Sequence, residues 1–90
     1  MTRHYTVLYK PEFERQFRKL ERVIQVRVGA AIDALTTNAH PSGSKKLHGA
    51  EDLYRVRVGD YRVVYQIREN VVTIVLIRVA HRRDVYRKDF

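Results

Sequence analysis

The sequence predicts an α+β fold, with an N-terminal strand and an α-hairpin packed on one face of a twisted, mainly antiparallel four-stranded sheet and a short C-terminal helical tail. Three observations predict this class. The chain has 90 residues, enough for one hydrophobic core, so residues 1–90 are expected to form a single domain. Apolar residues recur with a helical period before residue 37. After residue 46 they recur with a period of two, which is typical of strands.

The first third of the chain is predicted to hold one strand and two helices. Residues 5–9 (Tyr-Thr-Val-Leu-Tyr) are rich in β-forming types and predict a short strand. Pro11 suits the first turn of a helix, and the two helices are expected to join near residues 20–23 as an α-hairpin. Their apolar positions, three and four residues apart, are Phe13, Phe17 and Leu20, followed by Ile24, Val28, Ala31 and Leu35.

The predicted strands follow a loop at residues 38–46. Two strands of alternating polarity flank Gly59-Asp60, and this pair predicts a two-residue hairpin turn because glycine tolerates a positive φ. After a tight turn near residues 69–70, residues 71–79 form a run that is apolar at both parities. Such a strand is covered on both faces, so we expect it in the interior of the sheet.

The register of this hairpin decides where its arginines lie. With a two-residue loop, Arg57 pairs with Arg62 and Arg55 pairs with Val64, and directly paired residues point to the same side of a sheet. Arg55, Arg57 and Arg62 therefore share one face, whereas a slip of one residue would scatter them. Opposed like charges cost a few tenths to about 1 kcal/mol, so the cluster favours a role in binding adjacent phosphates. The alternative is solvation, or ion pairing with Glu51, Asp52 or Asp60.

The charge balance indicates polyanionic partners. Lys and Arg number 18 against 10 Asp and Glu, for a net charge of +8, and 13 of the 18 are arginine. The guanidinium of arginine is planar and permanently charged, and it can bind a phosphate through two hydrogen bonds. This favours a nucleic-acid partner over a merely solvated basic surface. The chain has no cysteine, no apolar run long enough to span a membrane and no signal peptide, which together predict a cytoplasmic protein without membrane contact.

The C-terminal segment adds further basic and aromatic residues. Arg82 and Tyr86 are four positions apart, so a helical turn would set a guanidinium beside a phenol. Tyr86 could instead be a packing anchor. His81 is the one nearby side chain that titrates near neutrality, which makes it a possible proton carrier, or a plain polar residue at a strand end.

No motif indicates a metal site or a cofactor. The four histidines lack metal-ligand spacing, the glycines form no phosphate loop, and no serine–histidine–acid arrangement is recognisable. We therefore predict neither metal nor cofactor.

Three segments give the chain a resemblance to the RelE/ParE toxin superfamily, and within it to the RelE branch. They are Lys46-Leu47-His48-Gly49, the hairpin from Leu53 to Tyr65, and the closing run from Arg78 to Arg87, and the resemblance covers essentially the whole chain. It implies a toxin of a toxin–antitoxin pair that enters the ribosomal A site, cleaves mRNA there and inhibits translation. It also implies a RelB-like antitoxin that silences the toxin, in a complex that binds operator DNA through the antitoxin.

The resemblance assigns roles to individual residues. Arg62 matches the phosphate-binding arginine of the family, Arg55 and Arg57 match two basic strand residues, and Arg82 and Tyr86 match an arginine and a tyrosine of the tail. Some members carry lysines at the two strand positions, where a lysine could act as a general base, but arginine effectively cannot deprotonate. The residues expected to contact RNA around this centre are Lys45, Lys46, Arg83 and Arg87.

Two other functions fit the same fold. A ParE-like module would inhibit DNA gyrase by binding and hydrolyse nothing, and it would have no need to gather these arginines on one face. A plain RNA-binding domain would expose stacking aromatics on the basic face, whereas the strand tyrosines here fall on the opposite face.

Overall fold

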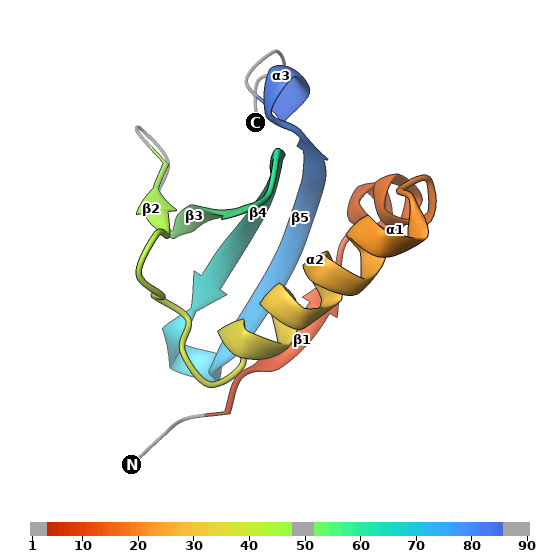
Figure 1. Cartoon of the computed structure of the whole chain (residues 1–90). Helices are drawn as coiled ribbons and strands as arrows, with labels where there is room; N and C mark the ends of the chain where they lie inside the picture. The colour runs from red at the N-terminus through yellow and green to blue at the C-terminus, as the bar shows by residue number, and fades with distance from the viewer. Residues whose placement is uncertain (1–3, 48–51, 86–90) are drawn as a thin grey trace.

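Both helices of the N-terminal hairpin lie on one face of a curved five-stranded sheet (Figure 1). The computed structural model describes residues 4–47 and 52–85. In chain order the elements are β1 (Thr6–Tyr9), α1 (Pro11–Arg18), α2 (Arg22–Leu35), β2 (Lys45–Lys46), β3 (Leu53–Val58), β4 (Tyr61–Arg68), a 3-10 turn (Glu69–Val71), β5 (Thr73–His81) and α3 (Arg82–Val85).

The sheet has the order β1-β5-β4-β3-β2. β1 runs parallel to β5, and every other neighbouring pair is antiparallel, so the predicted mainly antiparallel sheet is confirmed. The predicted number of four strands is wrong by one. The additional strand, β2, pairs with β3 from inside the expected loop. Two consecutive lysines are too short a segment to show a strand period, which is why the sequence gives no sign of it.

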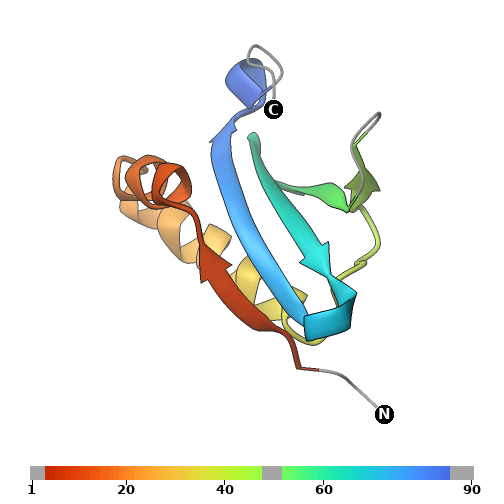
Figure 2. The same ribbon diagram turned by 180° about the vertical axis from the view of Figure 1, so that it is seen from behind.

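The core fills the space between the helices and the sheet. Phe13 of α1 and Val28 of α2 are buried against Val63 and Leu76, whose exposed fractions are 0%. β5 is interior, as predicted, and Val75 on its other face is also buried. Seen from behind, the sheet faces the viewer and neither long helix covers it (Figure 2). One face of the sheet therefore packs against the helices to form the core, and no long helix packs on the other face.

Helix α1 covers the edge of β5 that β1 leaves unpaired. The pairing of β1 with β5 ends at Tyr9 opposite Leu76. Beyond that point the backbone N–H of Val79 donates to Oε1 of Gln16 at 2.9 Å, so a helix side chain takes the place of a neighbouring strand. This contact holds α1 alongside the second half of β5.

The β3–β4 turn has the predicted two-residue geometry. Gly59 has a φ of +60°, which L side chains rarely adopt, and the guanidinium of Arg27 on α2 lies over it. The carbonyl of Asp60 accepts a 2.7 Å hydrogen bond from the backbone N–H of Arg82. The turn is thus tied to the start of α3. Within the part of the chain that the structure describes, every helix is too short or too polar to cross a membrane.

Candidate nucleic-acid interface

The sheet face opposite the helices carries a cluster of cations. The predicted register is confirmed: Arg57 pairs with Arg62, and Arg55 with Val64. Lys45 of β2 pairs with Arg55 and therefore points to the same side. On β5, Arg78 pairs with Val64. We call this side of the sheet the basic face, and its cations in the described strands are Lys45, Arg55, Arg57, Arg62, Arg78 and, at the far end of β4, Arg68.

Arg62 is the most unusual member of the basic face. Its exposed fraction is 7%, and its buried Nε has no hydrogen-bond partner. A buried N–H without an acceptor loses its hydration without compensation, so this arrangement costs stability. An anion that reaches the guanidinium would supply both an acceptor and an opposite charge. The side chain is consequently suited to hold a phosphate rather than to stabilise the free protein.

Carboxylates do not neutralise the arginines of the hairpin, as far as the described residues go. Neither Asp52 nor Asp60 lies within ion-pair distance of Arg55, Arg57 or Arg62. Glu51, the remaining candidate counter-ion, lies outside the described residues. Within the described residues, the positive charge of Arg55, Arg57 and Arg62 is therefore available to a partner.

The tail enters the same end of the sheet. The hydrogen bond from Arg82 to Asp60 sets the start of α3 beside the hairpin turn, two residues from Arg62. Arg82 and Arg83 are both exposed. Tyr86 and Arg87, which the sequence assigns to the site, lie outside the described residues.

The structure does not bring His81 to the arginines. His81 pairs with Tyr61, and the two rings meet edge to face at 5.5 Å. Tyr61 packs against the core on the helix side, so the imidazole lies on the face opposite Arg57 and Arg62. Its Nδ1 accepts a 3.3 Å hydrogen bond from the backbone N–H of Arg83. This placement favours a structural role at the start of α3 over proton transfer at the basic face.

The two lysines of β2 are also separated. Lys45 belongs to the basic face, but Lys46 pairs with Tyr54, which packs against the core. Since paired residues share a side, Lys46 points away from the arginines. Only Lys45 therefore extends the basic face to the outer edge of the sheet.

The sequence pattern did not place Arg78 on the basic face. Simple alternation along β5 puts Arg78 on the side of Ile74 and Leu76, which face the core. A register shift between Val64 and Tyr65 leaves Ile77 without a partner, so that Leu76 faces Tyr65 while Arg78 faces Val64. Because of this irregularity, the residues of β5 after Ile77 point to the opposite faces from those that simple alternation predicts, and Arg78 lies on the basic face. A lone arginine within an apolar run was the available signal.

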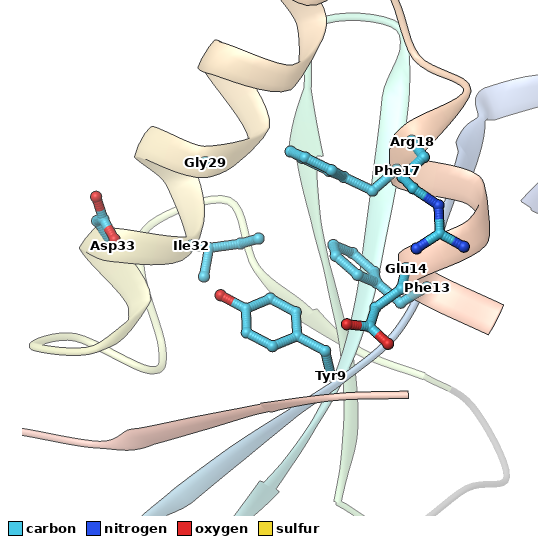
Figure 3. Close-up of a pocket in the computed structure, with 8 residues that line it drawn as sticks. All are labelled: Tyr9, Phe13, Glu14, Phe17, Arg18, Gly29, Ile32 and Asp33. Carbon is cyan, nitrogen blue, oxygen red and sulfur yellow. The ribbon is translucent and has the colours of Figure 1, made fainter. Parts of the chain in front are cut away.

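A separate groove lies on the helix side, between α1, α2 and β1 (Figure 3). Its volume is about 390 Å³, and Gly29 leaves room on α2, since nothing lies within 4 Å of where its Cβ would be. Apolar and charged side chains line it together: Tyr9, Phe13, Phe17 and Ile32 with Glu14, Arg18 and Asp33. The groove is on the other side of the sheet from the basic face.

Tyr65 shows the different electrostatics of the helix side. Burial raises the pKa of its phenol, nearby Tyr54 adds to that effect, and a hydrogen bond with Ser44 opposes it. Its hydroxyl donates to the carbonyl of Ala39 at 3.0 Å. The neutral phenol thus fastens the loop after α2 to the sheet. Among the described residues, no three His, Asp or Glu side chains gather where they could hold a metal ion.

Comparisons with known proteins agree with this architecture. The family model described as ParE toxin of type II toxin–antitoxin system, parDE, matches residues 7–86. Toxin RelG of Mycobacterium tuberculosis is 31% identical over 93% of this chain and 98% of its own length. Toxin RelE3 of Methanocaldococcus jannaschii is 30% identical over 89% of this chain and 93% of its own length.

Solved structures are similar over nearly the same span. RelE in the archaeal RelE–RelB complex of Pyrococcus horikoshii superposes with a TM-score of 0.79 at 28% identity, covering 93% of this chain and 99% of that one. The toxin–antitoxin complex RelBE2 of Mycobacterium tuberculosis gives a TM-score of 0.75 at 30% identity, covering 87% of this chain and 98% of that one. With the family model matching most of its length, the chain belongs to the ParE toxin family and is a toxin of a RelBE-type toxin–antitoxin system.

Proposed function

We propose that this toxin is a metal-independent endoribonuclease that cleaves mRNA in the ribosomal A site and thereby inhibits translation. The observation that carries the proposal is the buried Arg62 guanidinium, without an acceptor on Nε, directly opposite Arg57 on the basic face. Two like charges in this position destabilise the free hairpin. A phosphodiester backbone relieves both their repulsion and the desolvation of Arg62.

The proposed reaction is attack of a ribose 2′-oxygen on the adjacent phosphorus. The new oxygen–phosphorus bond forms as the bond to the 5′-oxygen breaks, which leaves a 2′,3′-cyclic phosphate. Arg62 and Arg82 stabilise the charge that develops on the phosphoryl oxygens, while Arg55 and Arg57 hold flanking phosphates. A base must accept the proton of the 2′-hydroxyl, and an acid must donate a proton to the departing 5′-oxygen. Arginine effectively cannot act as that base. Tyr86 is therefore the proposed proton carrier.

The partners follow from the same proposal. Similar toxins are seen in complexes named for RelE with RelB, and we infer a RelB-like antitoxin for this chain too. A basic toxin with a net charge of +8 fits an acidic antitoxin. We further infer that this antitoxin carries the operator-binding function of the complex and that the toxin acts in the cytoplasm on ribosomes and mRNA.

A second candidate is a non-enzymatic inhibitor of DNA gyrase, because the family model that matches is described as ParE. Primer extension on a translated message and a gyrase supercoiling assay, run with the same purified toxin, separate the two. The nuclease proposal expects new 3′ ends within translated codons and unchanged supercoiling. Inhibited supercoiling without cleavage would replace it with the gyrase function.

A further inference from the structure

Gln16 of α1 is held in one orientation by contacts at both of its polar atoms. Its Oε1 accepts a 2.9 Å hydrogen bond from the backbone N–H of Val79 in β5. Its Nε2 donates to Oε2 of Glu12 at 3.3 Å. An ionised carboxylate can only accept hydrogen bonds, so Glu12 keeps the amide turned with its oxygen toward Val79.

The contact lies where β5 loses its neighbour on one side. β1 pairs with β5 as far as Leu76, whose carbonyl accepts from the backbone N–H of Lys10 at 2.9 Å. Past Leu76, none of the strands that the structure describes lies on this side of β5. The next residue, Ile77, has no partner on β4 either. Val79 therefore follows an irregular part of the strand, where regular pairing on both sides does not fix the backbone.

The segment after Val79 connects two residues of the proposed site. The residue that follows Val79 pairs with Arg62. Two residues later, the backbone N–H of Arg82 donates to the carbonyl of Asp60 at 2.7 Å. The proposed reaction needs Arg62 and Arg82 on the same phosphoryl group, so the path of β5 between these points sets their separation. Gln16 holds the start of that path.

Stability alone does not require the contact. Gln16 is only partly buried, so water could accept from the N–H of Val79 in its place. A water molecule would not fix the position of that N–H, whereas an oriented amide on a packed helix does, and Phe13 anchors α1 in the core. A displacement of about 1 Å at a reacting centre can lower a rate about a hundredfold.

We propose that Gln16 is a positioning residue for RNA cleavage, which keeps Arg82 at the separation from Arg62 that the reaction needs. The inference rests on the proposed function, since it concerns a step of the same reaction. Gln16 acts through the backbone of β5 and does not touch RNA. Its removal should therefore slow the chemical step and leave the affinity for RNA unchanged.

The test compares Gln16→Leu with Gln25→Leu. Gln25 is the matched control because its Nε2, on a partly buried side chain of α2, also makes a 2.9 Å hydrogen bond to backbone, but to the carbonyl of Phe17 in α1. Each variant should lower the melting temperature by about 4–8 °C. Single-turnover cleavage on programmed ribosomes should slow about ten- to a hundredfold in Gln16→Leu and stay within about twofold of wild type in Gln25→Leu. Affinity for ribosomes whose A-site codon carries uncleavable 2′-deoxy residues should be the same in all three proteins.

A double variant and a measurement without RNA test the same contact. Glu12→Gln/Gln16→Glu exchanges the two side chains, so a carboxylate oxygen again accepts from Val79 and the net charge is unchanged. It should restore cleavage to within about threefold of wild type. Hydrogen exchange of the Arg82 amide in the free toxin should be faster in Gln16→Leu than in Gln25→Leu. Failure of the exchange to restore cleavage, or equal exchange rates of that amide, would overturn the proposal.

A purely structural role gives a different pattern. If Gln16 only stabilises the fold, Gln16→Leu and Gln25→Leu slow cleavage equally or leave it unchanged, and the proposal is overturned. The same holds if Gln16→Leu loses cleavage through weaker ribosome binding alone. If wild type cuts and Gln16→Leu cuts as fast, the inference fails and the proposed function stands. If wild type produces no new 3′ ends, the proposed function fails and the inference fails with it.

Discussion

The two faces of the β3–β4 hairpin are built from adjacent residues yet differ in almost every physical property. On the helix side, Val63 and Tyr65 are fully buried and packed into the core. On the other side, the residues alternating with them include Arg62, which is buried with a hydrogen-bonding atom unsatisfied. The packing against the helices is concentrated on one parity and the arginines on the other, where Val64 is also fully buried. Substitutions of neighbouring residues should therefore damage different properties.

The largest expected effect is loss of cleavage in Arg62→Gln. Removing one donor that stabilises transition-state charge costs about a hundred- to a thousandfold in rate. The variant should remain folded, and its melting temperature should be equal to or higher than that of the wild type, because a costly buried charge is gone. Single-turnover primer extension measures the rate, and thermal denaturation measures the fold. Undiminished cutting would remove Arg62 from the proposed site.

Leu76→Ala is the matching disruption of the other face. Leu76 is fully buried on the core side of β5, and truncating such a residue costs about 2–5 kcal/mol of unfolding free energy. Urea denaturation at 25 °C measures this loss. The folded fraction should still bind ribosomes with the wild-type salt slope, since no cation of the basic face is changed. A reduced slope in this variant would show that the two faces are not independent.

Sequence alone predicted the separation of the faces because a turn fixes it. Gly59 imposes a two-residue loop, and that loop sets the pairs Arg57 with Arg62 and Arg55 with Val64. No comparable local signal in the sequence determines the register in which β4 pairs with β5. The irregularity at Val64 and Tyr65 is a tertiary feature, so the face of Arg78 could not be read from alternation.

The remaining differences have the same origin. β2 exists only because β3 offers it an edge, and two lysines carry no intrinsic strand preference. The side on which His81 lies depends on its pairing with Tyr61, which again follows from the β4–β5 register. The residues of the turn were sufficient to predict the face on which the hairpin arginines lie. The faces of Arg78 and His81 on β5 depend on the long-range pairing of β5 with β4.

Gly59→Ala tests the turn that sets the register. A residue with a side chain at a φ of +60° is strained, and its Cβ would lie 3.2 Å from Nη1 of Arg27. We expect a loss of about 1–2 kcal/mol in unfolding free energy. Because the arginine tip is flexible and can move, most of that cost should come from the backbone. Gly59→Asn, which tolerates the left-handed region better, should recover part of the loss in the same urea titration, and equal losses in both variants would point to the contact with Arg27 instead.

Tyr65→Phe should produce the smallest effect, and one that depends on pH. At pH 7 the loss of the hydrogen bond to Ala39 should cost about 1 kcal/mol. Burial raises the pKa of Tyr65 above its ordinary value near 10, so below pH 10 both states hold the neutral phenol and its stabilisation is complete. As the pH rises through the folded-state pKa, the unfolded chain ionises first and this stabilisation is lost. The stability difference between wild type and Tyr65→Phe should therefore shrink as the pH rises above 10 in urea titrations, with Tyr9→Phe, at an exposed tyrosine, as the control. A difference that stays constant over that range would mean that the phenol is not shielded by the core.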